Sequence, residues 1–153
     1  MTKIAWVLGV ALALASCLDV EDRPALSMLG NINSLALTTE DTLIITRAIT
    51  NAGQAEMWLN AAADAFEMTT TGGARVCDAS AMLALSAPEN VRIPAGQGVV
   101  DERRFALSEL PNCTAGSYAI AFVAHFRESE DAPDSFTLRT SSSTFTLTAP
   151  PTP

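Results

Sequence analysis

The segment Ser117–Phe126 constrains the fold more than any other part of the chain. It contains aromatic and β-branched residues, and both of its alternating sets of side chains are largely apolar. Because neighbouring side chains of a strand point to opposite faces, this pattern predicts a central strand that is covered on both sides. Any fold of this chain must therefore place other elements against both faces of one long strand.

Shorter strand patterns, separated by turn signals, occur throughout the rest of the chain. Leu35–Thr50 is rich in β-branched residues around a Glu40-Asp41 turn, and Asn51-Ala52-Gly53 ends it. Further short strands are predicted at Met57–Leu59, Met82–Leu85, Val91–Ile93, Val99–Leu107, Phe136–Leu138 and Phe145–Leu147. The pattern indicates an all-β chain, with a single antiparallel β-sandwich over residues 35–148 and a frayed tail over residues 149–153. Residues 61–68 are ambiguous between helix and strand, because Asn60 could cap a short helix there.

The charge of the chain excludes one class of partner. The 153 residues carry a formal net charge of −8, and the only lysine, Lys3, lies near the N-terminus. Nucleic-acid binding depends on Lys and Arg side chains that neutralise phosphates, so we expect no nucleic-acid partner. The same charge opposes electrostatic docking on anionic lipid headgroups.

The N-terminus has the features of an export signal. Lys3 precedes the apolar run Ile4–Ala15, which as a helix would be roughly 18 Å long and too short for the ~30 Å hydrocarbon core of a membrane. This predicts a cleavable signal helix over residues 1–16. The run ends in Leu14-Ala15-Ser16-Cys17, which resembles the lipobox of bacterial lipoproteins at every position.

The lipobox resemblance implies that the chain is cut before Cys17 and that this cysteine carries the lipid. Two or three long acyl chains would anchor the protein stably to a membrane. Residues 17–34 are then predicted to form a short tether, because Pro24 breaks helix and the residues before Leu35 are turn-prone. Leu18 stands where inner-membrane retention usually has an aspartate, so the outer membrane is favoured in a cell envelope with two membranes.

Lipidation of Cys17 leaves an even pair of cysteines, Cys77 and Cys113. In an oxidising compartment such a pair predicts a disulfide, and closing this long loop would contribute roughly 3–4 kcal/mol. A redox or metal-binding pair is the alternative, but the chain has no Cys-x-x-Cys motif and only one histidine. We therefore expect a structural bridge.

Three patches resemble bacterial immunoglobulin-like domains. Ile49-Thr50-Asn51-Ala52-Gly53, at the centre of Leu43–Met57, resembles their hydrophobic-x-Asn-x-Gly segment. Val91–Gly96 resembles a later strand with its Pro-x-Gly turn, and Ala115–Tyr118 resembles the Gly-x-Tyr start of a late strand. Domains of this kind occur in cell-adhesion-related modules and in a proteinase inhibitor of bacilli. The resemblance implies an immunoglobulin-like sandwich, to which residues 61–73 and the cysteine pair are additions.

No residue pattern commits the chain to catalysis. The motifs Gly-x-Ser-x-Gly, Ser-x-x-Lys and His-Glu-x-x-His do not occur, and His125 lies inside the strongest strand pattern. We therefore expect a protein that is not an enzyme and that needs no cofactor. The loop with Glu128, Glu130, Asp131 and Asp134 could gather calcium, but it lacks the EF-hand glycine and final glutamate. A solvated acidic hairpin loop is the simpler interpretation.

Two side chains are candidates for contact with a partner. Arg47 interrupts the inward-facing set of its predicted strand, so it must pair with an acid, extend to solvent or mark an exposed sheet edge. The run Asp101–Arg104 is expected to form exposed ion pairs. Trp58 would bind sugar rings or a protein if it is exposed beside the Asn51–Gly53 turn, and burial in the core is the alternative.

These features favour a lipid-anchored, non-enzymatic protein of the cell envelope. Its immunoglobulin-like domain is expected to bind an envelope protein or a polysaccharide, and the lipid on Cys17 a membrane. The alternative hypothesis is a proteinase inhibitor that acts through an exposed loop, either Thr69–Ala74 or Glu128–Asp134.

Overall fold

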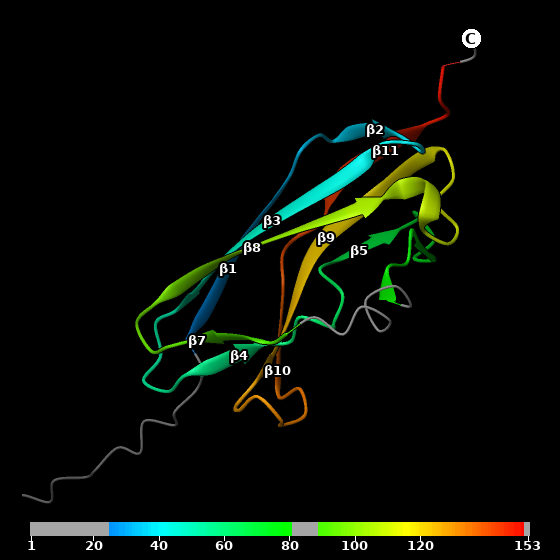
Figure 1. Cartoon of the computed structure of the whole chain (residues 1–153). Coiled ribbons are helices and arrows are strands. Elements are labelled where there is room, and N and C mark those ends of the chain that lie inside the picture. The colour runs from blue at the N-terminus through cyan, green and yellow to red at the C-terminus, as the bar shows by residue number, and fades with distance from the viewer. Residues whose placement is uncertain (1–24, 81–88, 152–153) are drawn as a thin grey trace, which may run out of the picture.

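The computed structural model describes residues 25–80 and 89–151, which form an immunoglobulin-like sandwich of two sheets (Figure 1). The smaller sheet has the order β1-β3-β8, with strands Leu26–Ile32, Thr42–Asn51 and Gly98–Ala106. The larger sheet contains β2 (Ala36–Thr38), β4 (Met57–Leu59), β5 (Phe66–Thr69), β6 (Arg75–Val76), β7 (Val91–Ile93), β9 (Gly116–Arg127), β10 (Phe136–Arg139) and β11 (Ser143–Thr148). A short 3-10 turn, Leu107–Glu109, follows β8. The predicted signal helix and the predicted strand Met82–Leu85 lie outside the described residues.

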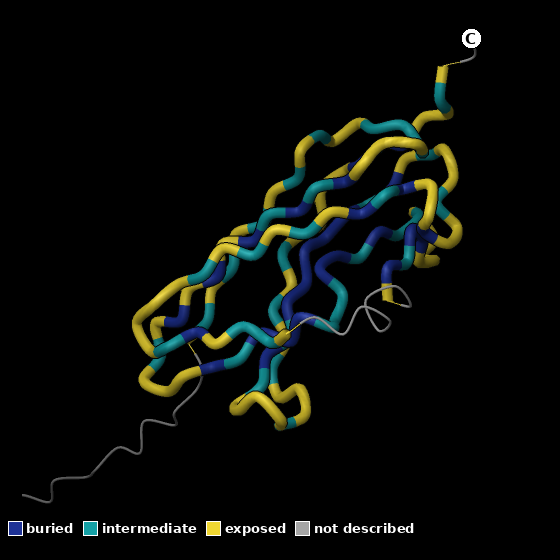
Figure 2. Tube along the Cα trace, viewed as in Figure 1, coloured by how far each residue is buried: buried dark blue, intermediate teal, exposed yellow. Residues whose placement is uncertain are grey.

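Strand β9 forms the centre of the larger sheet, as the sequence predicts. One edge of β9 pairs first with β11 and then with β10, and the other edge pairs first with β5 and then with β4. Its residues 120–124 are buried on both faces of the sheet, and Figure 2 shows this strand as the most continuously buried part of the trace. All pairings are antiparallel except that of β2 with β11, which is parallel.

The prediction of a tether over residues 17–34 is wrong for its second half. Residues 26–32 form β1, which pairs with β3 over its whole length. Met28 packs against both apolar clusters of the core, and Gly30 faces the Phe122 ring so closely that a Cβ atom would lie 2.2 Å from it. The domain therefore begins at Leu26, because alternate residues of β1 bury apolar surface that a tether would leave exposed.

The helix considered for residues 61–68 does not form. A turn follows Asn60, and Phe66–Thr69 is strand β5. Phe66 and Met68 alternate into the core at the two-residue period of a strand, and the buried apolar area decides against the helix. The Asn60 side chain accepts a hydrogen bond from the Ala62 amide at 3.0 Å, so it caps a turn rather than a helix.

The immunoglobulin-like motifs have a physical basis in this fold. The buried Asn51 side chain donates to the carbonyl oxygens of Ala55 and Ile93, and it accepts from the Gly53 amide. It thereby closes the turn after β3 and ties it to β7. At the start of β9, the Tyr118 hydroxyl donates to the Thr114 carbonyl at 2.8 Å, which is the tyrosine corner of such sandwiches.

The core between the sheets consists of two apolar clusters. One contains Leu43, Ile45, Phe66, Phe105, Tyr118, Ile120 and Phe145, and the other contains Ile49, Met57, Leu59, Ile93 and Phe126. On β3 the two clusters are separated by Arg47, which is only 1% exposed. A buried charge therefore divides an otherwise apolar interior.

Candidate functional site

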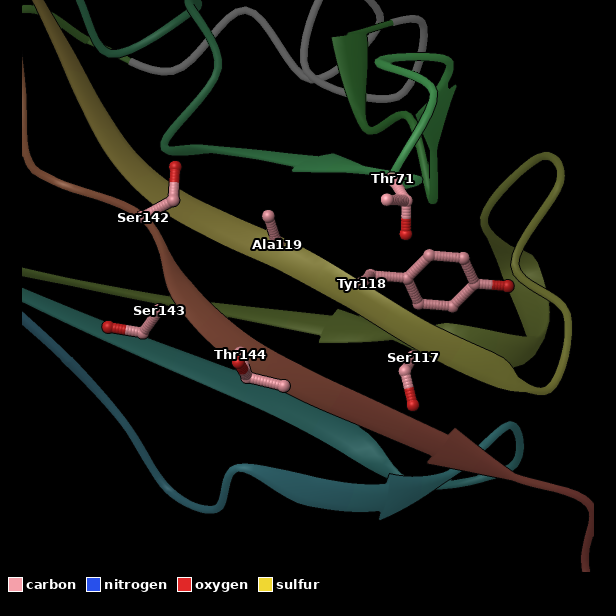
Figure 3. Close-up of a pocket in the computed structure, with 7 residues that line it drawn as sticks. All are labelled: Thr71, Ser117, Tyr118, Ala119, Ser142, Ser143 and Thr144. Carbon is pink, nitrogen blue, oxygen red and sulfur yellow. The ribbon is translucent and has the colours of Figure 1, made fainter.

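A shallow groove lies on the outer face of the larger sheet, over the first half of β9 (Figure 3). It has a volume of about 300 Å³ and is lined by Thr71, Ser117, Tyr118, Ala119, Ser142, Ser143 and Thr144. We call it the hydroxyl groove. Thr144 lies directly opposite Ala119 in the pairing of β11 with β9, so the small Ala119 side chain forms part of its floor.

The local sequence explains why the groove forms. Thr140 still pairs with β9, since its amide donates to the Phe122 carbonyl and its hydroxyl accepts from the Phe122 amide. The chain then leaves β9 between β10 and β11 and rejoins it at Ser143. Thr71, at the tip of the β5–β6 hairpin, supplies the opposite rim (Figure 3).

The chemistry of the groove is neutral and rich in hydroxyl groups. Thr71, Ser117, Ser142, Ser143 and Thr144 are all exposed, so their hydroxyls are open to solvent or to a ligand. Each hydroxyl can both donate and accept a hydrogen bond. None of the lining residues is charged, although the whole chain carries a net charge of −8. The groove therefore suits an uncharged ligand with many hydroxyl groups.

Arg47, a predicted partner contact, is instead buried between the sheets. It lies on the central strand of the smaller sheet, so the prediction of an exposed edge is wrong and that of an acidic partner is confirmed. Its Nε donates to Asp101 Oδ2 at 3.0 Å, and its Nη1 reaches across the sandwich to the Val123 carbonyl. Burial lowers the pKa of Arg47, and the adjacent Asp101 carboxylate opposes that effect.

The expectation that Asp101–Arg104 forms exposed ion pairs holds for only half of the run. Glu102 and Arg104 pair at 2.9 Å on the surface. Asp101 and Arg103 point inward, because β8 alternates, and they pair at 3.2 Å beside Arg47. Arg103 Nη1 also donates to the Ala63 carbonyl at 2.9 Å. We call Arg47, Asp101 and Arg103 the arginine layer.

The arginine layer fills a gap in the larger sheet. Between β4 and β5 the chain turns away from β9, so the ladder of backbone hydrogen bonds is interrupted there. At this interruption, the two guanidinium groups donate hydrogen bonds to the carbonyl oxygens of Ala63 and Val123. Buried carbonyl groups need such partners, and the Asp101 carboxylate pairs with both arginines. The layer is structural and is closed to a partner.

Trp58 lies neither in the core nor fully in solvent. It is half-buried on the outer face of the larger sheet, while its neighbours Met57 and Leu59 point into the core. Across the sheet it lies opposite Arg92 on β7 and Arg127 on β9. Its Nε1 is buried without a hydrogen-bond partner in the described part of the chain, so this donor is not open to a ligand.

The acidic loop between β9 and β10 is held down by one of its carboxylates. Asp134 accepts hydrogen bonds from Arg127 Nε at 2.9 Å and from Asn60 Nδ2 at 2.9 and 3.0 Å. Burial alone would raise the pKa of Asp134, but these hydrogen bonds and the Arg127 charge hold it below its ordinary value. Within the described residues, no three His, Cys, Asp or Glu side chains are grouped to hold a metal ion, and Glu128, Glu130 and Asp131 are exposed.

His125 is placed as a strand residue, on the outer face of β9. Its Nδ1 lies 3.1 Å from the Thr137 hydroxyl and 3.9 Å from Asp134 Oδ2. Along β9 it is separated from Ala119 by six positions, or roughly 20 Å. It therefore cannot act as a base for the hydroxyls of the groove.

The two cysteine predictions have different outcomes. Cys77 and Cys113 form a disulfide, which joins the end of β6 to the loop before β9. Cys17 lies outside the described residues. In the portion that the structure does describe, no helix is both long and apolar enough to span a membrane.

The sequence did not indicate the groove or its residues Ser142–Thr144, although Thr71 belongs to the loop Thr69–Ala74 that was considered for an inhibitor. Their signal is the run Thr140-Ser141-Ser142-Ser143-Thr144, which is unusually rich in hydroxyls beside two strands. A polar run of this kind is also typical of a loop, so the pattern alone does not separate a binding groove from a connection. The pairing of β11 with β9 sets Thr144 opposite Ala119 and Thr146 opposite Ser117, and so places the hydroxyls of both strands on the outer face of the sheet.

Comparisons with known proteins establish the fold and no family. No family model matches the chain, and no curated protein matches it. Among solved structures, the C-terminal domain of Wzt is similar, with 15% identity, a TM-score of 0.52 and coverage of 84% of this chain and 81% of that one. A β-glucosidase of Erythrobacter marinus matches at 13% identity and a TM-score of 0.44, over 82% of this chain and 16% of the enzyme, and carries no argument about activity. The likeness to the Wzt domain supports a β-sandwich of this size.

Proposed function

We propose that the chain is a non-enzymatic, lipid-anchored protein of the bacterial cell envelope that binds a polysaccharide through its immunoglobulin-like domain. The ligand is an uncharged, hydroxyl-rich polymer that lies in the hydroxyl groove. The anchor is the lipid on Cys17, and the membrane is the outer one where the envelope has two.

The observation that carries this proposal is the composition of the groove. Five exposed hydroxyls line a neutral hollow of about 300 Å³ on an otherwise strongly acidic chain. Pockets for small molecules enclose most of their ligand, whereas this hollow is shallow and open. A polymer can pass through such a groove while its hydroxyls exchange hydrogen bonds with those of the protein.

The sequence supports the envelope location. Leu14-Ala15-Ser16-Cys17 resembles a lipobox, and the Cys77–Cys113 disulfide fits an oxidising compartment. The alternative function, a proteinase inhibitor, has less support. The loop Thr69–Ala74 is a tight hairpin in which the Gly73 amide donates to the Thr70 carbonyl at 2.9 Å, and an inhibitor needs an extended segment that can enter a protease cleft.

A glycan array probed with the detergent-solubilised, lipidated protein tests the proposal. We expect binding to neutral envelope polysaccharides, with little dependence on salt because no ion pair is involved. The double variant Ser117→Ala, Thr144→Val should bind about tenfold more weakly, since it removes two hydrogen-bonding groups worth roughly 0.5–1.5 kcal/mol each.

The matched control is Thr137→Val, an exposed threonine on the outer face of the same sheet but outside the groove. It should bind as tightly as the unmodified protein. Equal binding by the groove variant, or a preference for proteins over all glycans, would overturn the proposal.

A further inference from the structure

An apolar stripe crosses the outer face of the smaller sheet. Leu29 on β1 lies opposite Ala48 on β3, and Ala48 lies opposite Val100 on β8. Leu29 is 78% exposed and Val100 is 72% exposed, although both belong to regular strands. Large apolar side chains that are aligned and exposed in this way mark a surface that something else covers.

The remainder of this face carries almost no net charge. Beside the stripe, its strand residues are one ion pair and the uncharged residues Ser27, Asn31, Thr42, Ile44, Thr46, Thr50, Gly98 and Ala106. That pair is Glu102 with Arg104, at 2.9 Å, and its charges cancel. The whole chain has a net charge of −8, but this face has no net charge, so an anionic lipid surface does not repel it.

The position of the anchor indicates what covers the stripe. β1 begins at Leu26, and the stripe crosses it at Leu29. Residues 17–25 span at most roughly 30 Å even when they are fully extended. A lipid on Cys17 therefore keeps this sheet within reach of the bilayer surface.

We infer that the stripe of Leu29, Ala48 and Val100 rests on the lipid bilayer to which Cys17 is anchored. This inference rests on the lipid anchor of the proposed function and adds an orientation to it. The two sheets form opposite layers of the sandwich (Figure 1), so the hydroxyl groove on the larger sheet faces away from the membrane. The contact is apolar, and salt does not release it.

Fluorescence quenching on vesicles tests this orientation. The lipidated full chain is reconstituted into phosphatidylcholine vesicles that contain some phosphatidylglycerol and a lipid with a spin label near the headgroup. A fluorophore is attached to Ala48→Cys, and, as the matched control, to Thr137→Cys on the opposite sheet. We expect the label at position 48 to be quenched about twofold or more relative to the control, at low and at high salt. Adding Leu29→Ser and Val100→Ser should reduce its quenching to the control level.

Three outcomes would overturn the inference. Equal quenching at positions 48 and 137 would mean that the stripe does not contact lipid. Quenching at position 48 that depends on the number of protein molecules per vesicle, and persists without spin-labelled lipid, would assign the stripe to a second copy of the chain.

The intact mass of the same sample separates a failure of the orientation from a failure of the proposed function. A mass without acyl chains would overturn the anchor and the orientation together. Unquenched position 48 in a lipidated protein would overturn the orientation alone.

Discussion

The two sheets of this sandwich are built in different ways. In the smaller sheet, β1 and β8 each pair with β3 along an unbroken register. In the larger sheet, both edges of β9 are interrupted, between β4 and β5 on one side and between β10 and β11 on the other. The first interruption is filled by the arginine layer, and the second borders the hydroxyl groove.

The regular smaller sheet is stabilised by its own pairing, whereas the irregular larger sheet has further contacts and carries the groove. The smaller sheet is held by alternating apolar side chains and backbone pairing. The larger sheet also has contacts from two arginines of the opposite sheet, a disulfide and the Asn60–Asp134 contact. Binding residues often lie on irregular segments of this kind, which the regular strands hold in position.

The largest effect is expected from breaking the arginine layer. Asp101→Ala leaves Arg47, which is 1% exposed, without its carboxylate and should destabilise the fold by about 3–5 kcal/mol. Urea unfolding of the purified protein measures this loss. Glu102→Ala, at the adjacent but exposed position, is the control and should cost less than about 1 kcal/mol. Equal losses for the two variants would show that the layer does not support the larger sheet.

The disulfide should come next. Cys77 and Cys113 are separated by 36 residues, and replacing both with alanine should lower the free energy of unfolding by about 3–4 kcal/mol. Adding a reductant to the unmodified protein should shift its urea midpoint to that of the double variant. A midpoint that does not respond to reductant would contradict this.

A smaller loss is expected from Gly30→Ala. The new Cβ atom would lie 2.2 Å from the Phe122 ring, so β1 must move away from the larger sheet, at a cost of about 1–3 kcal/mol. Gly72→Ala is the control, since its nearest neighbour is 3.8 Å away, and it should change stability by less than about 0.5 kcal/mol. If Gly30→Ala had no effect, residues 26–32 would behave as the tether that the sequence first indicated.

The smallest effect concerns pH and the acidic loop. The pKa of Asp134 is below its ordinary value of 3.8, so its contribution to stability is fully present above that pH and is lost as the pH falls through the lowered pKa. Asp134→Asn should therefore be less stable than the unmodified protein near neutral pH, and the difference should shrink well below about pH 4. Urea midpoints at both pH values provide the comparison, and a difference that is independent of pH would refute the role given to Asp134.

The sequence predicts the regular parts of the fold well. β4 and β7 have the predicted bounds, and β8, β9, β10 and β11 differ from them by one or two residues. The immunoglobulin-like sandwich is confirmed, as are the turns after Asn51 and Pro94. These features depend on local patterns, namely alternation along a strand and the residues that turns require.

The errors arise where distant segments decide the structure. β1 contains polar residues and glycine, and it becomes a strand because it pairs with β3 and because Gly30 packs closely against the Phe122 ring. Arg47 is buried because Asp101, on another strand, lies directly opposite it. The hydroxyl groove joins residues of β9, β11 and the β5–β6 hairpin. Such partners cannot be read from a local pattern, since each segment alone has a simpler interpretation.

The most direct test of polysaccharide binding on the larger sheet is a titration followed by backbone amide chemical shifts. The lipidated protein in detergent micelles is titrated with the neutral polysaccharide that binds best on the array. We expect the largest shift changes at Ser117–Ala119, Ser142–Thr144 and Thr71, and little change along β1 and β3. Changes concentrated in the smaller sheet, or in the acidic loop between β9 and β10, would contradict the account.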